Sequence, residues 1–338
     1  MPSIRLELNR YGYDPFIDFM KGICILLVIL NHSIPSEIRS SIGFPFWGSP
    51  AVPIFLIIQV FHFYKKGIDS VKLNYIKIWK RIVCPFFVVE LLIFVVWLYK
   101  CYRIDASSIP SIRDSVYMLT GGPGSYYPWI YLQFAMLLPI IRPLLRMNSI
   151  YVLLVFLLLS QFAELLCSLI TMPEWIYRLT FFRYIFLIYL GYLLATKGII
   201  LNRITMLLSI ISIASIILFA YSNIDTSPVF YNVDAWSTCH WISYIYIVFF
   251  MMMMLKKTCV CLQNNNLSGL IIHIGKYSYE IYLFQLLFFT CVSDYIINLF
   301  SIDDKIITTT ILSTLLCVIP VLLYKKIKEI FKQTRIIN

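Results

Sequence analysis

Residues 18–33 read DFMKGICILLVILNHS, an apolar run with a lysine near its start and a histidine near its end. Similar blocks of about twenty residues recur along the chain, and that length as a helix crosses a hydrocarbon core of roughly 30 Å. Of the 338 residues, 60% are hydrophobic and only 13% are charged, whereas about a quarter are charged in soluble domains. The sequence therefore excludes an ordinary soluble protein and predicts an all-α, polytopic membrane protein.

The apolar blocks predict about ten transmembrane helices in a single domain over residues 1–338. No removable signal peptide and no inverted internal repeat of the transporter type stands out. The expected spans are Phe16–Ser33, Ser49–Tyr64, Ile82–Tyr99, Tyr127–Leu145, Ile150–Thr171, Leu179–Thr196, Ile204–Tyr221, His240–Leu255, Ser278–Phe300 and Ile306–Leu323.

The connectors between these blocks are strongly asymmetric in charge. Most of the 28 basic residues lie in the N-terminal tail and in every second connector, up to Lys325–Arg335. The opposite set of connectors holds only Arg39, Lys100, Arg103, Arg113, Arg178 and Lys305. Because basic connectors stay inside, both termini are expected to be cytoplasmic.

This topology also explains the net charge of +11, which in a soluble chain would suggest nucleic acid as a partner. We expect no nucleic-acid partner and a multi-pass protein of the inner, or cytoplasmic, membrane, in contact with its lipids. The nine cysteines and four histidines show no metal-ligand or disulfide spacing, so no metal is expected.

Lys21 and His32 are the most informative ionisable residues inside an apolar block. They are eleven residues apart, so a helix places them on one face about 16 Å apart. A snorkelling lysine and an interfacial, hydrogen-bonded histidine would be an ordinary structural explanation. The alternative is functional, because histidine is the side chain best suited to accept a proton near neutral pH.

A second candidate is the basic cluster before the third block, Lys77, Lys80 and Arg81. Ordinary positive-inside charge would explain it. Yet the spacing puts three cations on one helix face at the membrane surface, where they could hold a phosphate-rich ligand. Isolated polar residues inside or near other blocks are weaker candidates for lining a cavity. They are Asp18, Tyr127, Gln133, Arg183 and Glu280. Structural pairing of such residues with one another would also explain them.

Several of these stretches resemble the membrane-bound acyltransferase family 3, whose members are integral-membrane O-acyltransferases of cell-surface glycans. In DFMKGICILLVILNHS, Asp18, Lys21, Gly22 and His32 fill the family's first-helix pattern. KIWKRIVCPF resembles the start of the third helix through Lys77 and Arg81. AVPIFLIIQVFHFYKK resembles the second-helix pattern, but Gln59 and Val60 replace the usual Ser-Gly. FFRYIFLIYLGYLL resembles the central span through Arg183 and Gly191, and IGKYSYEIYLFQLL resembles a late element in which Gln285 stands where histidine is common.

The resemblance implies transfer of an acyl group, usually acetyl, from cytoplasmic acetyl-CoA as co-substrate to a hydroxyl of a sugar or polysaccharide acceptor, either lipid-linked or free. It implies that Lys77, Lys80 and Arg81 hold the CoA phosphates and that the pantetheine arm passes Lys21. His32 would then be the general base or, as an alternative, a transient acyl carrier. The competing hypothesis from the residues alone is a transporter or flippase of a lipid-linked glycan or small metabolite, because many spans and buried charges fit either class.

Overall fold

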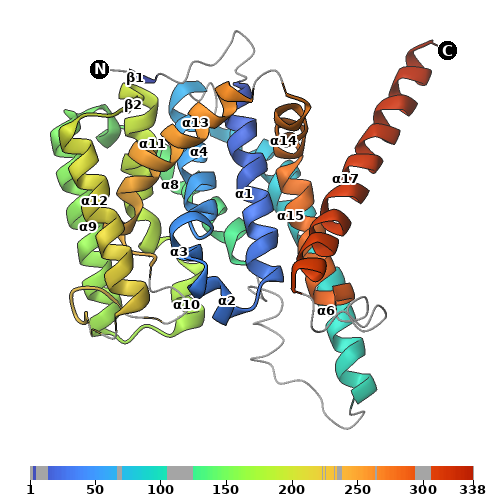
Figure 1. Ribbon diagram of the computed structural model, residues 1–338, viewed down its shortest axis with the longest axis horizontal. Coiled ribbons are helices and arrows are strands. Elements are labelled where there is room, and N and C mark those ends of the chain that lie inside the picture. Colours follow the sequence, from blue (N-terminus) through green and yellow to red (C-terminus); the bar gives the residue numbers. More distant parts are fainter. Residues whose placement is uncertain are drawn as a thin grey trace.

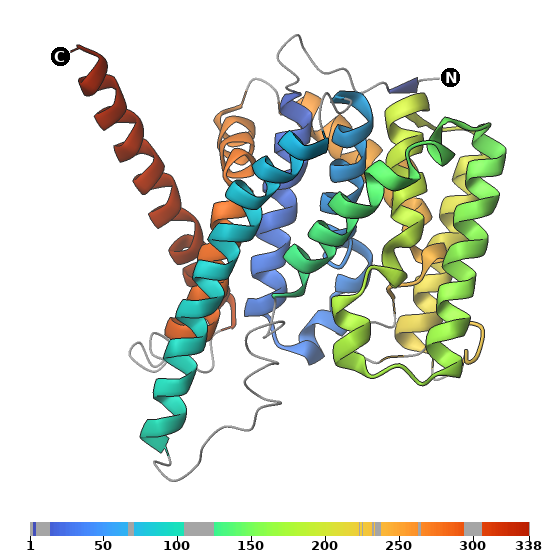
Figure 2. The same cartoon turned by 180° about the vertical axis from the view of Figure 1, so that it is seen from behind.

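The computed structural model describes residues 3–4, 14–66, 71–104, 125–222, 224, 226–231, 233, 238–262, 265–293 and 306–337. These residues form a bundle of helices, seen from two opposite sides in Figures 1 and 2. The first half contains α1 (Pro15–Ser33), α2 (Ser36–Ser41), α3 (Phe44–Trp47), α4 (Ala51–Lys66), α5 (Val71–Ile78), α6 (Cys84–Ile104), α8 (Tyr126–Ile141) and α9 (Ser149–Leu169). The second half contains α10 (Glu174–Leu179), α11 (Ile185–Lys197), α12 (Arg203–Tyr221), α13 (Met252–Cys261), α14 (Asn266–Lys276), α15 (Ser278–Leu287) and α17 (Ile306–Ile337).

Shorter turns join several of these helices. Three are π-helical, η1 (Trp79–Val83) between α5 and α6, η6 (Ile247–Met251) before α13 and η7 (Phe288–Val292) after α15. In the described ranges three are 3₁₀ turns, η2 (Leu144–Arg146), η3 (Phe182–Tyr184) and η5 (Trp241–Tyr244). One antiparallel pair of two-residue strands, β1 (Ser3–Ile4) and β2 (Ile199–Ile200), holds the start of the chain against the end of α11.

The predicted all-helical membrane fold is confirmed. The described residues contain seven helices long and apolar enough to cross a membrane, and each matches one predicted span. They are Pro15–Ser33, Phe44–Lys65, Tyr75–Arg103, Ser149–Leu169, Arg203–Tyr221, Trp241–Cys261 and Ile306–Phe331. The other three predicted spans correspond to shorter helices, α8, α11 and α15 with η7, so the total of ten stays a prediction.

The outer helices expose the apolar surface that a lipid environment requires. On α6, Phe87, Val88, Leu91 and Val95 are exposed, and α9, α12 and α17 expose similar side chains. A contiguous apolar surface of this extent would be costly in water but is favourable against lipid chains. Together with the spanning helices, this surface makes the chain a multi-pass membrane protein.

Figures 1 and 2 place β1 and the last turns of α17 at the same end of the bundle. We call this the near end, and the opposite end, where α2 and α10 lie, the far end. An even number of crossings between the two termini agrees with this arrangement. The prediction that the near end is cytoplasmic rests on the basic connectors.

Helix α1 is the central element, with α4 and α14 beside it (Figure 1). It starts with a helix cap, because the Asp14 carboxylate accepts a hydrogen bond of 2.9 Å from the Phe16 N–H and proline occupies the next position. Two glycines allow α14 to approach closely. A Cβ atom on Gly22 would lie 2.2 Å from the Ile271 carbonyl oxygen, and one on Gly275 would lie 1.7 Å from the Asp18 carbonyl oxygen.

We therefore expect Gly275→Ala to destabilise the protein by about 1–3 kcal/mol, because the added methyl group forces α1 and α14 apart. Gly269→Ala on the same helix is the matched control. A Cβ there meets nothing within 4 Å, and alanine favours a helix interior over glycine. Melting temperatures of the two purified variants in detergent measure the difference; equal values would contradict this packing.

Helix α11 fills the middle of the second half of the bundle, and every residue from Ile185 to Ala195 is buried. It packs against α4 and α9. Gly191 makes the contact with α4 possible, because a Cβ there would lie 2.5 Å from the Val60 Cβ. Because Gly191 has no side chain, the Val60 side chain has room between α4 and α11.

Candidate functional site

One cavity of about 740 Å³ runs between α1, α4, α8 and α15. Each helix contributes one face, as the three-to-four-residue spacing of its lining residues shows. On α4 the lining residues include Val52, Phe55, Gln59 and His62; on α1, Lys21, Val28, Asn31 and His32; on α8, Tyr126, Tyr127 and Tyr131; on α15, Ser278, Tyr279 and Tyr282.

The cavity extends along most of α1 from the near end to the far end. Lys21 lines it near the start of α1 and His32 near the end, which corresponds to about 16 Å along the helix axis. At the far end the wall is completed by α2, α3 and α10 and by Thr238 and Cys239. The two residues singled out in the sequence are thus joined by one continuous space.

His32 is exposed to this cavity rather than packed in the core. Its ring lies 5.7 Å from that of Phe289 in a tilted arrangement. The neighbouring Asn31 accepts two hydrogen bonds from Arg39, of 3.1 Å to its backbone oxygen and 2.6 Å to its Oδ1. An imidazole that is open to the cavity can take a proton from a hydroxyl that enters the far end.

The near end carries two lysines, Lys21 and Lys276. Lys21 pairs with the buried Asp18 at 3.0 Å across one helical turn, so Asp18 supports the lining residue and is not itself part of the lining. Lys276 lies at the end of α14, with its ammonium nitrogen 5.4 Å from the centre of the Tyr277 ring. Two cations at one mouth suit the phosphate groups of a ligand.

The predicted basic cluster lies beside this mouth but does not line the cavity. Lys77, Lys80 and Arg81 are exposed, the last two within the π-helical turn η1. The next residue, Ile82, does line the cavity, and its carbonyl accepts a 2.6 Å hydrogen bond from the Tyr279 hydroxyl. The cluster is therefore at the rim, one residue away from the cavity wall.

Among the weaker candidates, Tyr127 lines the cavity, whereas Gln133 and Arg183 lie behind its wall. The Gln133 side chain donates to the Leu179 carbonyl at 2.6 Å and accepts from the Phe181 N–H at 3.0 Å. Its amide thereby fixes the end of α10.

The Arg183 guanidinium is buried in a cage of tyrosine rings. It lies 5.2 Å from the ring centre of Tyr126, 5.4 Å from that of Tyr177 and 4.7 Å from that of Tyr184. It also donates to the backbone oxygens of Tyr177 at 3.3 Å and Arg178 at 3.0 Å. Since Tyr126, Tyr184 and Arg178 line the cavity, Arg183 positions the wall without forming it.

Glu280 also lies outside the lining, where it pairs with Lys325 and ties α15 to α17.

The two glutamines that depart from the family pattern, Gln59 and Gln285, lie in different places. Gln59 faces the cavity, its Nε2 donates to the Tyr131 carbonyl at 2.8 Å, and its Oε1 is buried with no hydrogen-bond partner in the described part of the chain. Gln285 is buried outside the lining.

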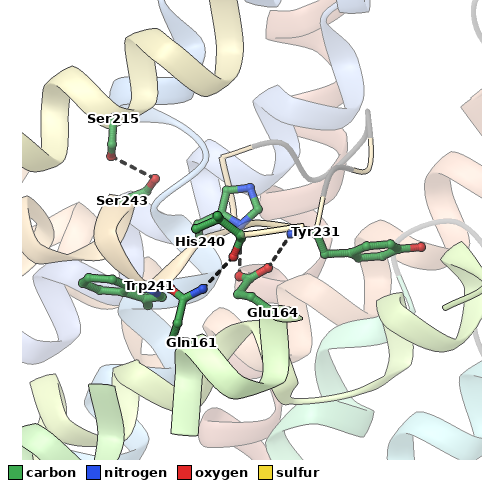
Figure 3. Close-up of polar contacts among 8 residues, drawn as sticks. Gln161, Glu164, Ser215, Tyr231, His240, Trp241 and Ser243 are labelled. Carbon is green, nitrogen blue, oxygen red and sulfur yellow. Dashed lines mark hydrogen bonds and ion pairs between the residues drawn. The ribbon is translucent and has the colours of Figure 1, made fainter. Parts of the chain in front are cut away.

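A second buried polar cluster supports the far wall (Figure 3). The Glu164 carboxylate on α9 lies 3.0 Å from the His240 Nδ1 and accepts from the Tyr231 N–H at 3.1 Å. Gln161, one turn earlier, accepts from the Trp241 Nε1 at 3.0 Å. Both contacts anchor the segment that carries Thr238 and Cys239, so His240 has a structural role here.

Within the described residues, no three His, Cys, Asp or Glu side chains gather as a metal site would require.

Several lining residues were missed by the sequence, including Arg39, His62, Arg178 and Lys276. One signal could have found two of them. Arg39 and Arg178 belong to the small set of basic residues in the connectors predicted to lie outside, against the general charge bias. Their position at the far end of the cavity explains why arginine occurs on the side of the membrane where basic residues are otherwise few.

Comparison with known proteins gives one result. A family model described as an acyltransferase domain matches residues 14–325, almost the whole chain. No curated protein and no solved structure matches.

Proposed function

Because this chain belongs to the acyltransferase 3 family, we propose that it transfers an acyl group, most simply acetyl, from cytoplasmic acyl-CoA to a hydroxyl of a cell-surface sugar or polysaccharide precursor. The observation that carries the proposal is one continuous cavity, with Lys21 and Lys276 at one end and an accessible His32 at the other. A donor held at the near end and an acceptor entering from the far end would meet inside it. The transporter alternative rested on spans and buried charge alone, which the acyltransferase family has as well.

The near end fits the donor by charge. Lys21 and Lys276 line the mouth, and Lys77, Lys80 and Arg81 lie at its rim. Charge-assisted hydrogen bonds from such cations would hold the phosphates. The distance of about 16 Å to His32 along α1 is comparable with a pantetheine arm, so the thioester would reach the far half of the cavity. Acyl-CoA supplies an activated acyl group whose thiol leaves readily.

His32 would act as the general base. Its imidazole takes the proton of the acceptor hydroxyl as the hydroxyl oxygen attacks the acyl carbonyl carbon. When the carbon–sulfur bond breaks, the same proton goes to the departing thiolate, and neutral imidazole is restored. Holding both reactants in one narrow cavity supplies the rest of the acceleration.

The proposal is tested with membranes that contain the protein, labelled acetyl-CoA and the envelope glycan fraction of the producing cell. We expect label in the glycan as an ester that mild alkali releases, and none with membranes that lack the protein. Label that stays in CoA or free acetate under all conditions would contradict acyl transfer to a glycan.

A further inference from the structure

The far end of the cavity is lined by two arginines, Arg39 from α2 and Arg178 from α10. Both helices lie at the end of the bundle opposite β1 (Figure 1). Among the described residues that line the cavity, near end included, there is no aspartate or glutamate. A cavity walled by one sign of charge concentrates ligands of the opposite sign.

The two oxygens that Arg39 contacts on Asn31 are uncharged, its backbone oxygen and its side-chain amide oxygen. Both bonds come from one guanidinium nitrogen, whereas the group carries five N–H donors. These contacts fix the arginine next to His32 while leaving its positive charge without compensation by Asn31. The side chain is half-buried, so the charge faces a restricted volume of the cavity.

Arg178 is fixed differently, through its backbone. Its carbonyl accepts from Arg183, and Gln133 clamps the adjoining end of α10. Glu90, buried in α6 behind the lining, is close enough for its charge to interact with that of Arg178. Glu90 can balance Arg178, whereas none of the described lining residues is a carboxylate that could balance Arg39.

The rest of this part of the wall is neutral, polar and aromatic. Ser49, Thr238 and Tyr126 line it, and Gln59 faces the same cavity with an Oε1 that has no hydrogen-bond partner in the described part of the chain. A buried acceptor atom of this kind needs a donor such as a hydroxyl. Polar, aromatic and cationic groups together suit a sugar that also carries a negative charge.

We propose that the acceptor is an acidic glycan, whose carboxylate or phosphate is held by Arg39 and Arg178 while its hydroxyl faces His32. Guanidinium groups recognise both anions through paired, charge-assisted hydrogen bonds. This inference rests on the proposed acyl transfer and adds the class of acceptor. Arg39 and Arg178 are then the residues that select it.

The test compares three defined probes with labelled acetyl-CoA and the purified protein: an oligosaccharide that contains uronic acid, a sugar 1-phosphate and a neutral oligosaccharide of similar size. We expect transfer to one or both acidic probes and little to the neutral one. Arg39→Gln should raise the KM for the preferred acidic probe about 10- to 100-fold, as loss of a charged hydrogen bond implies. The KM for acetyl-CoA should not change.

Arg103→Gln is the matched control, because Arg103 is an exposed arginine at the end of α6 that does not line the cavity; it should behave as wild type. Binding, followed as the ligand-induced rise in melting temperature, gives a second readout without turnover. Equal binding of neutral and acidic probes, or an effect of Arg39→Gln on acetyl-CoA alone, would overturn the acidic acceptor. Transfer to the neutral probe would still support the proposed function, so the two failures are distinguishable.

Discussion

His32→Gln should lower the rate of acyl transfer by about 10²- to 10⁴-fold, the usual contribution of a general base. Glutamine keeps a polar side chain of similar reach but cannot take up the proton. Because His32 lies at the opposite end of the cavity from Lys21 and Lys276, the affinity for acetyl-CoA should stay the same. Single-turnover transfer from labelled acetyl-CoA, together with binding of CoA to the purified variant, measures the two effects separately.

Two other histidines provide the comparison. His62 also lines the cavity, whereas His273 is exposed on α14 outside it. His273→Gln should retain full activity. If His62→Gln abolishes transfer and His32→Gln does not, then the proton acceptor lies on α4 and the role given to His32 is wrong.

Lys21→Gln combined with Lys276→Gln should weaken binding of CoA by at least tenfold, because each lysine lines the near end and a hydrogen bond to a charged group contributes about 1.5–3 kcal/mol. Roughly 1.4 kcal/mol corresponds to a factor of ten in affinity. The transfer rate at saturating acetyl-CoA should change much less. Titration of the purified protein with CoA gives the dissociation constant directly.

The exposed cluster at the rim should have a smaller effect. Lys77→Ala with Arg81→Ala should raise the KM for acetyl-CoA, but by less than the loss of Lys21 and Lys276 does. The rim side chains are exposed, where screening weakens their contacts. Lys257→Gln is the control, since it removes an exposed cation of α13 that does not line the cavity. If the Lys21/Lys276 variant and the Lys77/Arg81 variant both bind CoA as wild type does, the cations at this end serve only membrane topology.

The sequence was sufficient to predict the long apolar helices and two of the residues that line the cavity, Lys21 and His32. Block length and composition identified the seven long apolar helices, because the bilayer imposes both. The spacing of Lys21 and His32 placed them on one face of a helix, which α1 confirms. Helical periodicity requires no knowledge of which other helices pack nearby.

The remaining lining residues depend on tertiary packing and could not be predicted in this way. Arg39 and Arg178 are far apart in the chain, and they share a cavity only because α2 and α10 both cap its far end. Conversely, Gln133 and Arg183 look like cavity residues in the sequence because they are polar and lie in apolar blocks. The structure shows that both satisfy backbone groups of α10 instead.

In the proposed reaction the acyl group travels along one cavity from the near end of the bundle to the far end. The most direct measurement uses proteoliposomes in which the near end faces outward, with the acceptor glycan trapped inside and labelled acetyl-CoA added outside. We expect labelled glycan in the lumen, and at most about a hundredth as much with His32→Gln. Label on the glycan only when acetyl-CoA and acceptor are on the same side of the membrane would contradict it.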